Sequence, residues 1–251
     1  MNRVTVVLCV SMLTLFGTVQ AQEESVPEQT YELKTSVASG LLIIQEGALI
    51  NPNPTAVLSL SGKTSDGLVF GVMGNQTLAG DEDINHDLRL WIGGNMELGT
   101  LEWKGRVFVV DRRQLFTWRA DDYWGMSLEI ERPWHLGDHR LSPYIEIERL
   151  MPFEFTTEQR AGWIGSVGIG DRWQFDPEAA IEARIGLAHN SRVLEFESTT
   201  FQQFELTIDI GKPQEAFHLY LPKIQHINVD ERLGDGRRDA TVASIEAVYR
   251  F

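Results

Sequence analysis

The sequence is poor in cysteine, and the only one in its 251 residues is Cys9. Cys9 lies in an apolar run from Val4 to Val19, which follows a basic Met-Asn-Arg start and ends in the small-residue sequence Val19-Gln20-Ala21. This combination is typical of a secretory signal peptide, and we predict that residues 1–21 are removed after Ala21. A membrane anchor, the alternative, would need roughly 20 apolar residues. The mature chain then has no disulfide, so burial or a closed hydrogen-bond network must stabilise it.

Basic residues and long hydrophobic segments are also scarce. Lys and Arg number 22 against 36 Asp and Glu, and removal of Arg3 with the signal peptide leaves 21 bases and a net charge of −15. Such an acidic chain argues against nucleic acid as a partner. After residue 21 no apolar run reaches the roughly 20 residues of a spanning helix. A soluble periplasmic all-β domain or a barrel remains, because only helices and closed barrels satisfy every backbone group in lipid.

The sequence does contain short segments in which apolar and polar residues alternate. In one of them Trp124, Met126 and Leu128 share one face while Ser127 and Glu129 share the other, since successive side chains of a strand point to opposite sides. Twelve segments of this kind are each close to the roughly 9 to 11 residues that a tilted strand needs to cross a bilayer. They cover 33–46, 54–63, 67–77, 86–97, 99–110, 122–132, 139–150, 160–171, 178–189, 201–211, 215–227 and 240–251.

The connections between these segments alternate in length. The long, polar ones are 75–85, 111–121, 151–159, 190–200 and 228–239. The short ones are 63–66, 97–99, 133–138, 172–178 and 211–214. Long outer loops and short inner turns are typical of transmembrane barrels, whereas the alternative, a half-buried sheet of a soluble protein, has no reason to keep this asymmetry. We therefore predict an all-β fold, a transmembrane antiparallel up-and-down β-barrel of about 12 strands over 33–251, preceded by a short N-terminal segment, 22–32.

The last segment ends the chain on two aromatic residues of one face, Tyr249 and Phe251. It resembles the closing strand of Gram-negative outer-membrane β-barrels, whose assembly signal is read at a terminal Tyr-x-Phe. The resemblance implies a location in the bacterial outer membrane and an assembly signal at Tyr249 and Phe251. It implies as partners the barrel-assembly machinery, outer-membrane lipid and lipopolysaccharide, and it leaves the oligomeric state open.

Four further stretches resemble uncharacterised porin-like outer-membrane barrels of Gram-negative bacteria. They are Asn51-Pro52-Asn53-Pro54, Ser65-Asp66-Gly67-Leu68-Val69-Phe70-Gly71-Val72, Asp87-Leu88-Arg89-Leu90-Trp91-Ile92-Gly93-Gly94 and Leu136-Gly137-Asp138-His139-Arg140-Leu141-Ser142-Pro143-Tyr144. In that family they correspond to a Pro-led strand, a hairpin strand, an acidic strand ending in Gly, and a later turn and strand. Met73-Gly74 departs from the pattern, because a Trp is usual there. The resemblance implies the architecture and says almost nothing about activity.

The predicted inner face of the barrel carries charges of both signs. The candidate channel-lining residues are Arg89, Glu102, Lys104, Arg106, Glu129, Glu131, Glu146, Glu148, Glu182, Arg184, Glu205, Asp209, Glu246 and Arg250. Nine are acids and five are bases, so pairing leaves acids over, and an unpaired carboxylate in a dry interior costs several kcal/mol. This favours a hydrated, porin-like channel for polar or cationic solutes. The alternative is a sealed barrel with a structural or adhesive role, in which salt bridges fill the lumen.

His189 and Ser191 form the one pair that suggests catalysis. Two residues apart on a strand, they point the same way, toward lipid at the outer rim, and the imidazole could activate the hydroxyl if Glu195 or Glu197 oriented it. The pair resembles the His-x-Ser of outer-membrane phospholipase A and of the barrel lipid A deacylases. The residue after the Ser is Arg192, where those enzymes have Asn or Gly. The alternative function is therefore an outer-membrane lipid hydrolase or deacylase.

No motif points to a cofactor. The acidic stretch 81–87 partly copies a calcium loop, but His86 stands where the loop requires Gly, and Ile92 where it requires Glu. The sequence has no Gly-rich phosphate loop and no Cys/His metal spacing. We predict neither a cofactor nor a metal site.

Overall fold

We analysed a computed structural model, which describes residues 29–39, 41–43, 48–51, 53–78, 86–112, 122–154, 159–194, 198–210, 217–229 and 239–251. The predicted signal peptide, 1–21, lies outside these residues. In the part of the chain that the structure describes, no helix has the length and apolarity to cross a membrane.

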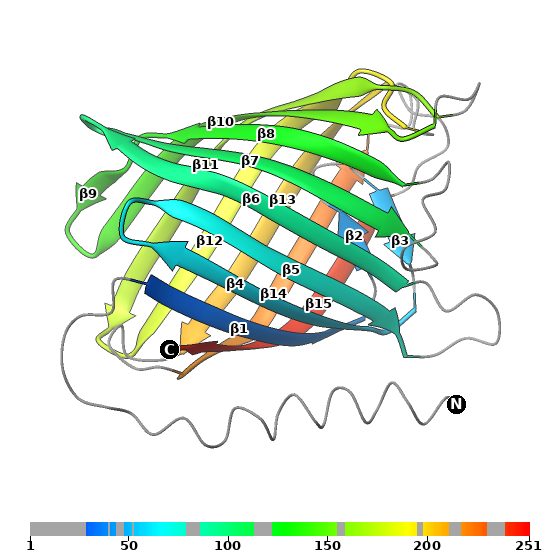
Figure 1. Cartoon of the computed structure of the whole chain (residues 1–251). Helices are drawn as coiled ribbons and strands as arrows, with labels where there is room; N and C mark the ends of the chain where they lie inside the picture. The colour runs from blue at the N-terminus through cyan, green and yellow to red at the C-terminus, as the bar shows by residue number, and fades with distance from the viewer. Residues whose placement is uncertain are drawn as a thin grey trace.

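Twelve strands form a closed antiparallel barrel (Figure 1). Around the wall they are β1 (Gln29–Ala38), β4 (Thr55–Thr64), β5 (Leu68–Thr77), β6 (His86–Leu98), β7 (Leu101–Arg112), β8 (Tyr123–Glu131), β10 (His139–Pro152), β11 (Gly162–Asp176), β12 (Ala179–Asn190), β13 (Thr199–Ile210), β14 (Phe217–Val229) and β15 (Ala240–Arg250). Strand β1 closes the barrel by pairing with β15, from Glu32 opposite Arg250 to Ala38 opposite Ser244. The prediction of an all-β, twelve-stranded transmembrane barrel is confirmed.

The first strand differs from the prediction. It was expected over 33–46, but β1 covers Gln29–Ala38 and so begins inside the segment that was expected to precede the barrel. The chain then forms a separate two-stranded sheet from β2 (Leu41–Ile43) and β3 (Ala48–Asn51) at one end of the barrel (Figure 1). The run of four apolar residues at 41–44 breaks the alternation that a wall between lipid and lumen requires.

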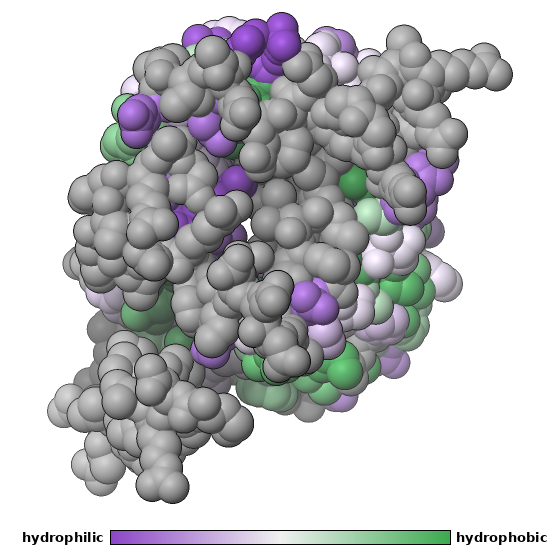
Figure 2. Space-filling model, turned by 90° about the vertical axis from the view of Figure 1, so that its right-hand side faces the viewer, coloured by the Kyte–Doolittle hydropathy of each residue, from purple (hydrophilic) through white to green (hydrophobic). Residues whose placement is uncertain are grey.

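The alternating pattern gives the barrel an apolar outside. Large apolar side chains on the outward positions are exposed, among them Ile92 on β6, Ile145 on β10 and Ile185 on β12. The residues just before and after each of these on its strand point inward, since successive side chains of a strand lie on opposite faces. Figure 2 shows apolar residues along the flank of the barrel and polar ones around the rim of the end that carries β2 and β3. An apolar outer belt with a polar interior is the arrangement of a barrel that spans lipid.

The two ends of the barrel differ in their connections. We call the end that holds Phe251 the terminal end and the opposite end the loop end (Figure 1). Short turns at the terminal end join β4 to β5, β6 to β7 and β11 to β12, and the left-handed φ of Gly67 (87°) and Gly99 (65°) suits these tight turns. Beside Gly67, the Thr64 hydroxyl donates to the Asp66 carboxylate and holds the pKa of that carboxyl below its usual value. The predicted alternation of long and short connections is present.

Strand β9 (Trp134–Leu136) is an addition to the barrel at the terminal end (Figure 1). It lies within the β8–β10 connection and pairs with the start of β10, from His139 opposite Leu136 to Leu141 opposite Trp134. This connection is therefore an ordered hairpin rather than a simple turn.

The seam between the first and last strands is fixed at the terminal end by the last residue. The backbone N–H of Phe251 donates to the Tyr31 carbonyl (2.9 Å), and the Tyr31 N–H donates to the Phe251 carbonyl (2.8 Å). The Phe251 ring stacks on the rings of Tyr31 and Tyr249, with centroid distances of 5.8 and 5.7 Å. Phe251 thus contributes both hydrogen bonds and aromatic packing to closure of the barrel.

Candidate functional site: the charged lumen

The register places all fourteen charged residues named above on the inward face. Cross-strand partners such as Lys104 opposite Glu129, and Arg184 opposite Glu205, lie on the side away from the exposed apolar belt. The same holds for Arg250, which lies opposite Glu32 at the seam. How these side chains pair determines whether the lumen can be dry.

In the middle of the lumen, Glu129 on β8 is held by two bases. Lys104 Nζ lies 2.9 Å from Glu129 Oε1, and Arg184 Nη2 lies 2.6 Å from Glu129 Oε2. Lys104 also lies 3.2 Å from Glu131 Oε2. Since β10 and β11 separate β8 from β12 in the wall, Arg184 reaches over two strands to make its contact. The ion pair therefore lies inside the lumen and does not join two neighbouring strands of the wall.

The Tyr144 ring packs against the guanidinium of Arg184. The guanidinium carbon lies 3.7 Å from the centroid of the Tyr144 ring, and Gln203 Nε2 donates to the Tyr144 hydroxyl at 2.9 Å. Glycines make room for this side chain, because a Cβ on Gly168 or Gly186 would lie 2.6 or 2.3 Å from the Tyr144 hydroxyl. Two glycines on neighbouring strands thus let the aromatic ring lie against the wall.

These groups surround a cavity of about 340 Å³. Its lining residues are Lys104, Arg106, Ser127, Glu129, Glu146, Arg184, Gln203, Phe204, Glu205 and Gln225. The volume is far above the roughly 10–15 Å³ that a single water requires. Arg106 is exposed although it points inward, and the side chains of Lys104 and Arg184 are 29% and 36% exposed. Solvent therefore reaches the charged groups of the inner wall.

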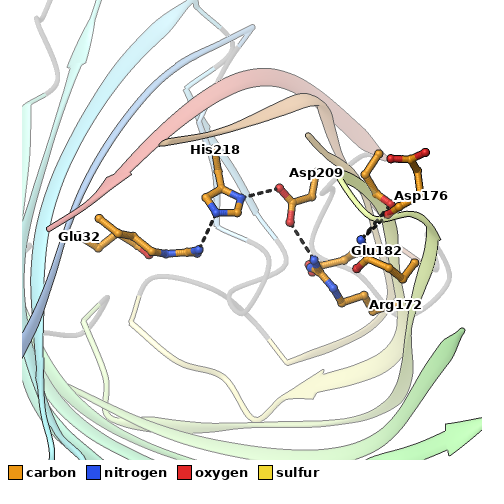
Figure 3. Close-up of polar contacts among 9 residues, drawn as sticks. Glu32, Arg172, Asp176, Glu182, Asp209 and His218 are labelled. Atoms are coloured by element: carbon orange, nitrogen blue, oxygen red, sulfur yellow. Dashed lines mark hydrogen bonds and ion pairs between the residues drawn. The ribbon is translucent and has the colours of Figure 1, made fainter. Parts of the chain in front are cut away.

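A second group of charges follows the wall near the terminal end (Figure 3). We call it the seam belt, and its members are Glu32, Arg250, His218, Asp209, Arg172 and Glu182. Arg250 Nε lies 3.1 Å from Glu32 Oε2, Arg172 Nη2 lies 2.9 Å from Asp209 Oδ2, and Arg172 also pairs with Glu182. The six come from six consecutive strands of the wall, so the belt ties β11 through β15 to β1.

His218 links the two halves of the seam belt. Its Nδ1 lies 3.2 Å from Asp209 Oδ1 and its Nε2 lies 3.1 Å from Arg250 Nη1. A guanidinium only donates hydrogen bonds, so Nε2 must accept, and the proton then sits on Nδ1 and is donated to Asp209. The geometry thus assigns a neutral imidazole, and His218 and Asp209 are each only 3% exposed.

The ion pairs include inward charges that the sequence-based set did not contain. They are one acid, Glu32, and four bases, Lys34, Arg140, Arg172 and Lys223. With these five residues the inward charges named here are ten acids and nine bases instead of nine and five. The acidic excess on which the preference for cationic solutes rested is therefore nearly removed.

The added residues were missed for reasons that differ. Arg140 shares the face of Glu146 and Glu148 in a predicted strand and could have been found by counting in twos. Glu32 and Arg172 lie one residue outside predicted strands. Lys223 follows a register shift between Tyr220 and Lys223, where counting in twos fails. Strand boundaries and one register shift thus hid three of the five residues.

Toward the loop end the inner wall becomes apolar. One cluster packs Phe108, Tyr123 and Leu150 against Val193 and Leu194, which come from the β12–β13 connection. A second cluster on the opposite strands contains Ala188, Phe201, Ile227, Ala240 and Val242. Arg192 and Leu194 have left-handed φ values of 61° and 52°, an uncommon conformation for residues other than Gly, and they place Val193 between them, fully buried. The 192–194 segment therefore packs on the inside of the wall.

The candidate catalytic residues lie at the loop end but do not pair with each other. His189 Nδ1 lies 2.9 Å from Thr200 Oγ1, whereas Ser191 Oγ accepts the Trp163 N–H at 2.9 Å. The proposed orienting acids, Glu195 and Glu197, lie outside the described residues. His189 and Ser191 thus each form a hydrogen bond with a residue of a different neighbouring strand.

The described residues contain no group of three or more His, Cys, Asp or Glu side chains that could hold a metal ion. Most of the acidic stretch that partly copies a calcium loop, residues 81–85, lies outside the described part of the chain.

No protein-family model and no curated protein matches the sequence. Solved structures of outer-membrane barrels do match the fold. The KdgM porin is 9% identical, with a TM-score of 0.54 over 88% of this chain and 99% of that one. An outer membrane channel from Pseudomonas putida F1 is 12% identical, with a TM-score of 0.54 over 92% and 100%. The β domain of the Bordetella autotransporter BrkA is 13% identical, with a TM-score of 0.52 over 89% and 98%.

At these identities the comparisons show the fold alone. The closed barrel, its apolar outer belt and the matches define the class by its fold, a twelve-stranded β-barrel with the architecture of outer-membrane barrels. Because the matches include both channels and an autotransporter domain, the function has to be argued from the lumen of this chain.

Proposed function

We propose that this chain is a small porin-like channel of the bacterial outer membrane that passes small polar solutes. The observation that carries the proposal is the solvent exposure of inward-facing charges, above all Arg106, around the cavity of about 340 Å³. Charged side chains in a dry lumen would each cost several kcal/mol unless fully paired. A water-filled lumen removes this cost and provides a path for solutes.

The charge balance argues for weak ion selectivity. Ten acids and nine bases make up the inward charges named above, so this set produces no strong field of one sign. The preference for cations predicted from the sequence is thereby reduced to a small one. A sealed barrel would instead need all charges paired as they are in the seam belt, and Arg106 does not fit that requirement.

The proposed location, the outer membrane, is supported by the predicted signal peptide and by the aromatic residues Tyr249 and Phe251. A signal peptide cleaved after Ala21 would deliver the chain to the periplasm, and the barrel-assembly machinery would read Tyr249 and Phe251. Phe251 supports this role, because it closes the seam with Tyr31 at the terminal end. In this setting the apolar belt contacts outer-membrane lipid and lipopolysaccharide.

Single-channel recording in a planar bilayer under a potassium chloride gradient tests the proposal. The mature chain, 22–251, refolded in detergent, should give discrete conductance steps with a reversal potential close to zero. A folded, heat-modifiable barrel that gives no steps would contradict the channel and favour a sealed barrel.

Two neighbouring positions on β8 provide a matched control. Ser127 lines the cavity, whereas Met126 faces outward and is 42% exposed. Ser127→Trp should lower the conductance by obstructing the lumen, and Met126→Trp should leave it unchanged. Equal effects of the two changes would place the ion path somewhere other than the lumen.

A further inference from the structure

The six charged groups that line the cavity differ in how they are paired. Glu129 binds both Lys104, at 2.9 Å, and Arg184, at 2.6 Å. Glu205 lies 3.6 Å from Lys223 and accepts a hydrogen bond from Gln225 Nε2 at 2.8 Å. These four groups therefore already have partners of opposite charge in the wall.

Arg106 and Glu146 are the two remaining charges, and they have opposite signs. Neither forms an ion pair with a described residue, and Glu146 accepts a hydrogen bond from the Ser166 hydroxyl. Arg106 lies opposite Ser127, and Glu146 lies between Glu129 on β8 and Ser166 on β11. Two carboxylates directly opposite each other on neighbouring strands repel. Of the bases around them, Lys104 and Arg184 bind Glu129, and Arg106 attracts Glu146 without forming an ion pair with it. Glu146 would therefore gain from a cationic group brought into the cavity.

The register gives the separation of the two groups. Arg106, Ser127 and Glu148 form one row across β7, β8 and β10, and Glu146 is two residues from Glu148 along β10. With strands about 4.8 Å apart and a rise of about 3.4 Å per residue, the two Cα atoms are about 10 Å apart around the wall and about 7 Å apart along it. The cavity that both side chains line, of about 340 Å³, has room for a molecule of a few non-hydrogen atoms.

We infer that the cavity is a binding subsite for small zwitterions such as α-amino acids. The carboxylate of the solute binds Arg106 through a charge-assisted, bidentate contact, and its ammonium group binds Glu146. Three acids and three bases line the cavity, so only a solute with both charges supplies both missing partners without adding net charge. The inference rests on the proposed channel, because the subsite lies on its path.

Three isosteric probes test this inference by saturation-transfer NMR on the detergent-solubilised barrel. Glycine carries both charges, propionate lacks the ammonium group, and glycinamide lacks the carboxylate. Saturable binding of glycine is expected, with propionate and glycinamide competing about tenfold more weakly, the order expected for loss of one charge-assisted contact. Equal competition by all three probes, or no binding of glycine, would overturn the inference.

Two substitutions should have opposite signatures. Arg106→Gln should remove most competition by propionate and retain that by glycinamide, and Glu146→Gln should do the reverse. Arg149→Gln is the matched control, because Arg149 faces outward over the Trp163 ring at 4.9 Å. Identical shifts in the Arg106 and Glu146 variants would contradict the assigned roles.

The binding measurement separates this inference from the proposed function. A barrel that conducts potassium but does not bind glycine retains the channel and refutes the subsite. A barrel that binds glycine but passes no ions refutes the channel and retains the subsite.

Discussion

The seam belt and the cavity wall are built from the same residue types, yet their charges are paired differently. In the belt each charge has a partner on a neighbouring strand, Asp209 and His218 are 3% exposed, and the other four side chains are 30–44% exposed. In the cavity wall Glu129 and Glu146 face each other, and Arg106 is exposed without an ion-pair partner among the described residues. The order of charges around the wall, and not their number, therefore decides which of them form ion pairs.

The largest expected effect comes from breaking the seam on which the belt depends. Deleting Phe251, or replacing Tyr249 and Phe251 with Ser, should abolish membrane assembly, because the last strand loses its hydrogen bonds and aromatic packing against Tyr31. The measurement is the amount of heat-modifiable barrel in outer-membrane fractions. Normal amounts of folded variant would show that the terminal aromatic residues are dispensable.

The belt and the cavity wall can be compared on one strand. Asp209→Asn should destabilise the barrel by about 1–3 kcal/mol, because His218 and Arg172 each lose a hydrogen bond to a buried carboxylate. Glu205→Gln, on the same face of β13, should cost at most about 1 kcal/mol, because this side chain is 31% exposed. Urea unfolding of the two variants measures the difference. Equal losses would mean that the buried contacts of Asp209 stabilise the barrel no more than the half-exposed contacts of Glu205 do.

A glycine substitution tests whether the wall fixes the positions of Tyr144 and Arg184 in the cavity. In Gly186→Ala the new Cβ would lie 2.3 Å from the Tyr144 hydroxyl, so the ring must move, at about 1–3 kcal/mol, and carry Arg184 with it. Gly165→Ala is the control, since no atom lies within 4 Å of its Cβ. Unfolding free energies and conductance of both variants should be measured. An unchanged Gly186→Ala barrel would show that the position of Tyr144 is not fixed by the wall.

The smallest expected change in stability is that of Arg106→Gln, within about 0.5 kcal/mol, because the side chain is exposed and has no ion pair to lose. Its effect should appear in selectivity instead. The reversal potential under a salt gradient should move toward cations in Arg106→Gln and toward anions in Glu146→Gln. Shifts of the same sign in both variants would contradict a lumen in which these two charges oppose each other.

The alternation that builds the wall of the barrel could be recognised from the residues alone. A period of two residues assigns each side chain to lipid or lumen, so Ile145 and Glu146 could be placed on opposite faces without coordinates. The same local signal located eleven of the twelve strands and failed at the first, where the apolar run after Ala38 breaks the period.

The tertiary structure decided which charges meet. Whether Arg184 reaches Glu129 depends on the stagger of four strands and on the room that Gly168 and Gly186 leave for Tyr144. It also decided that Val193 packs inside the wall and that His189 and Ser191 bind different neighbours. Alternation is a property of adjacent residues, whereas pairing across a lumen depends on the tilt and closure of the whole barrel, which no single segment contains.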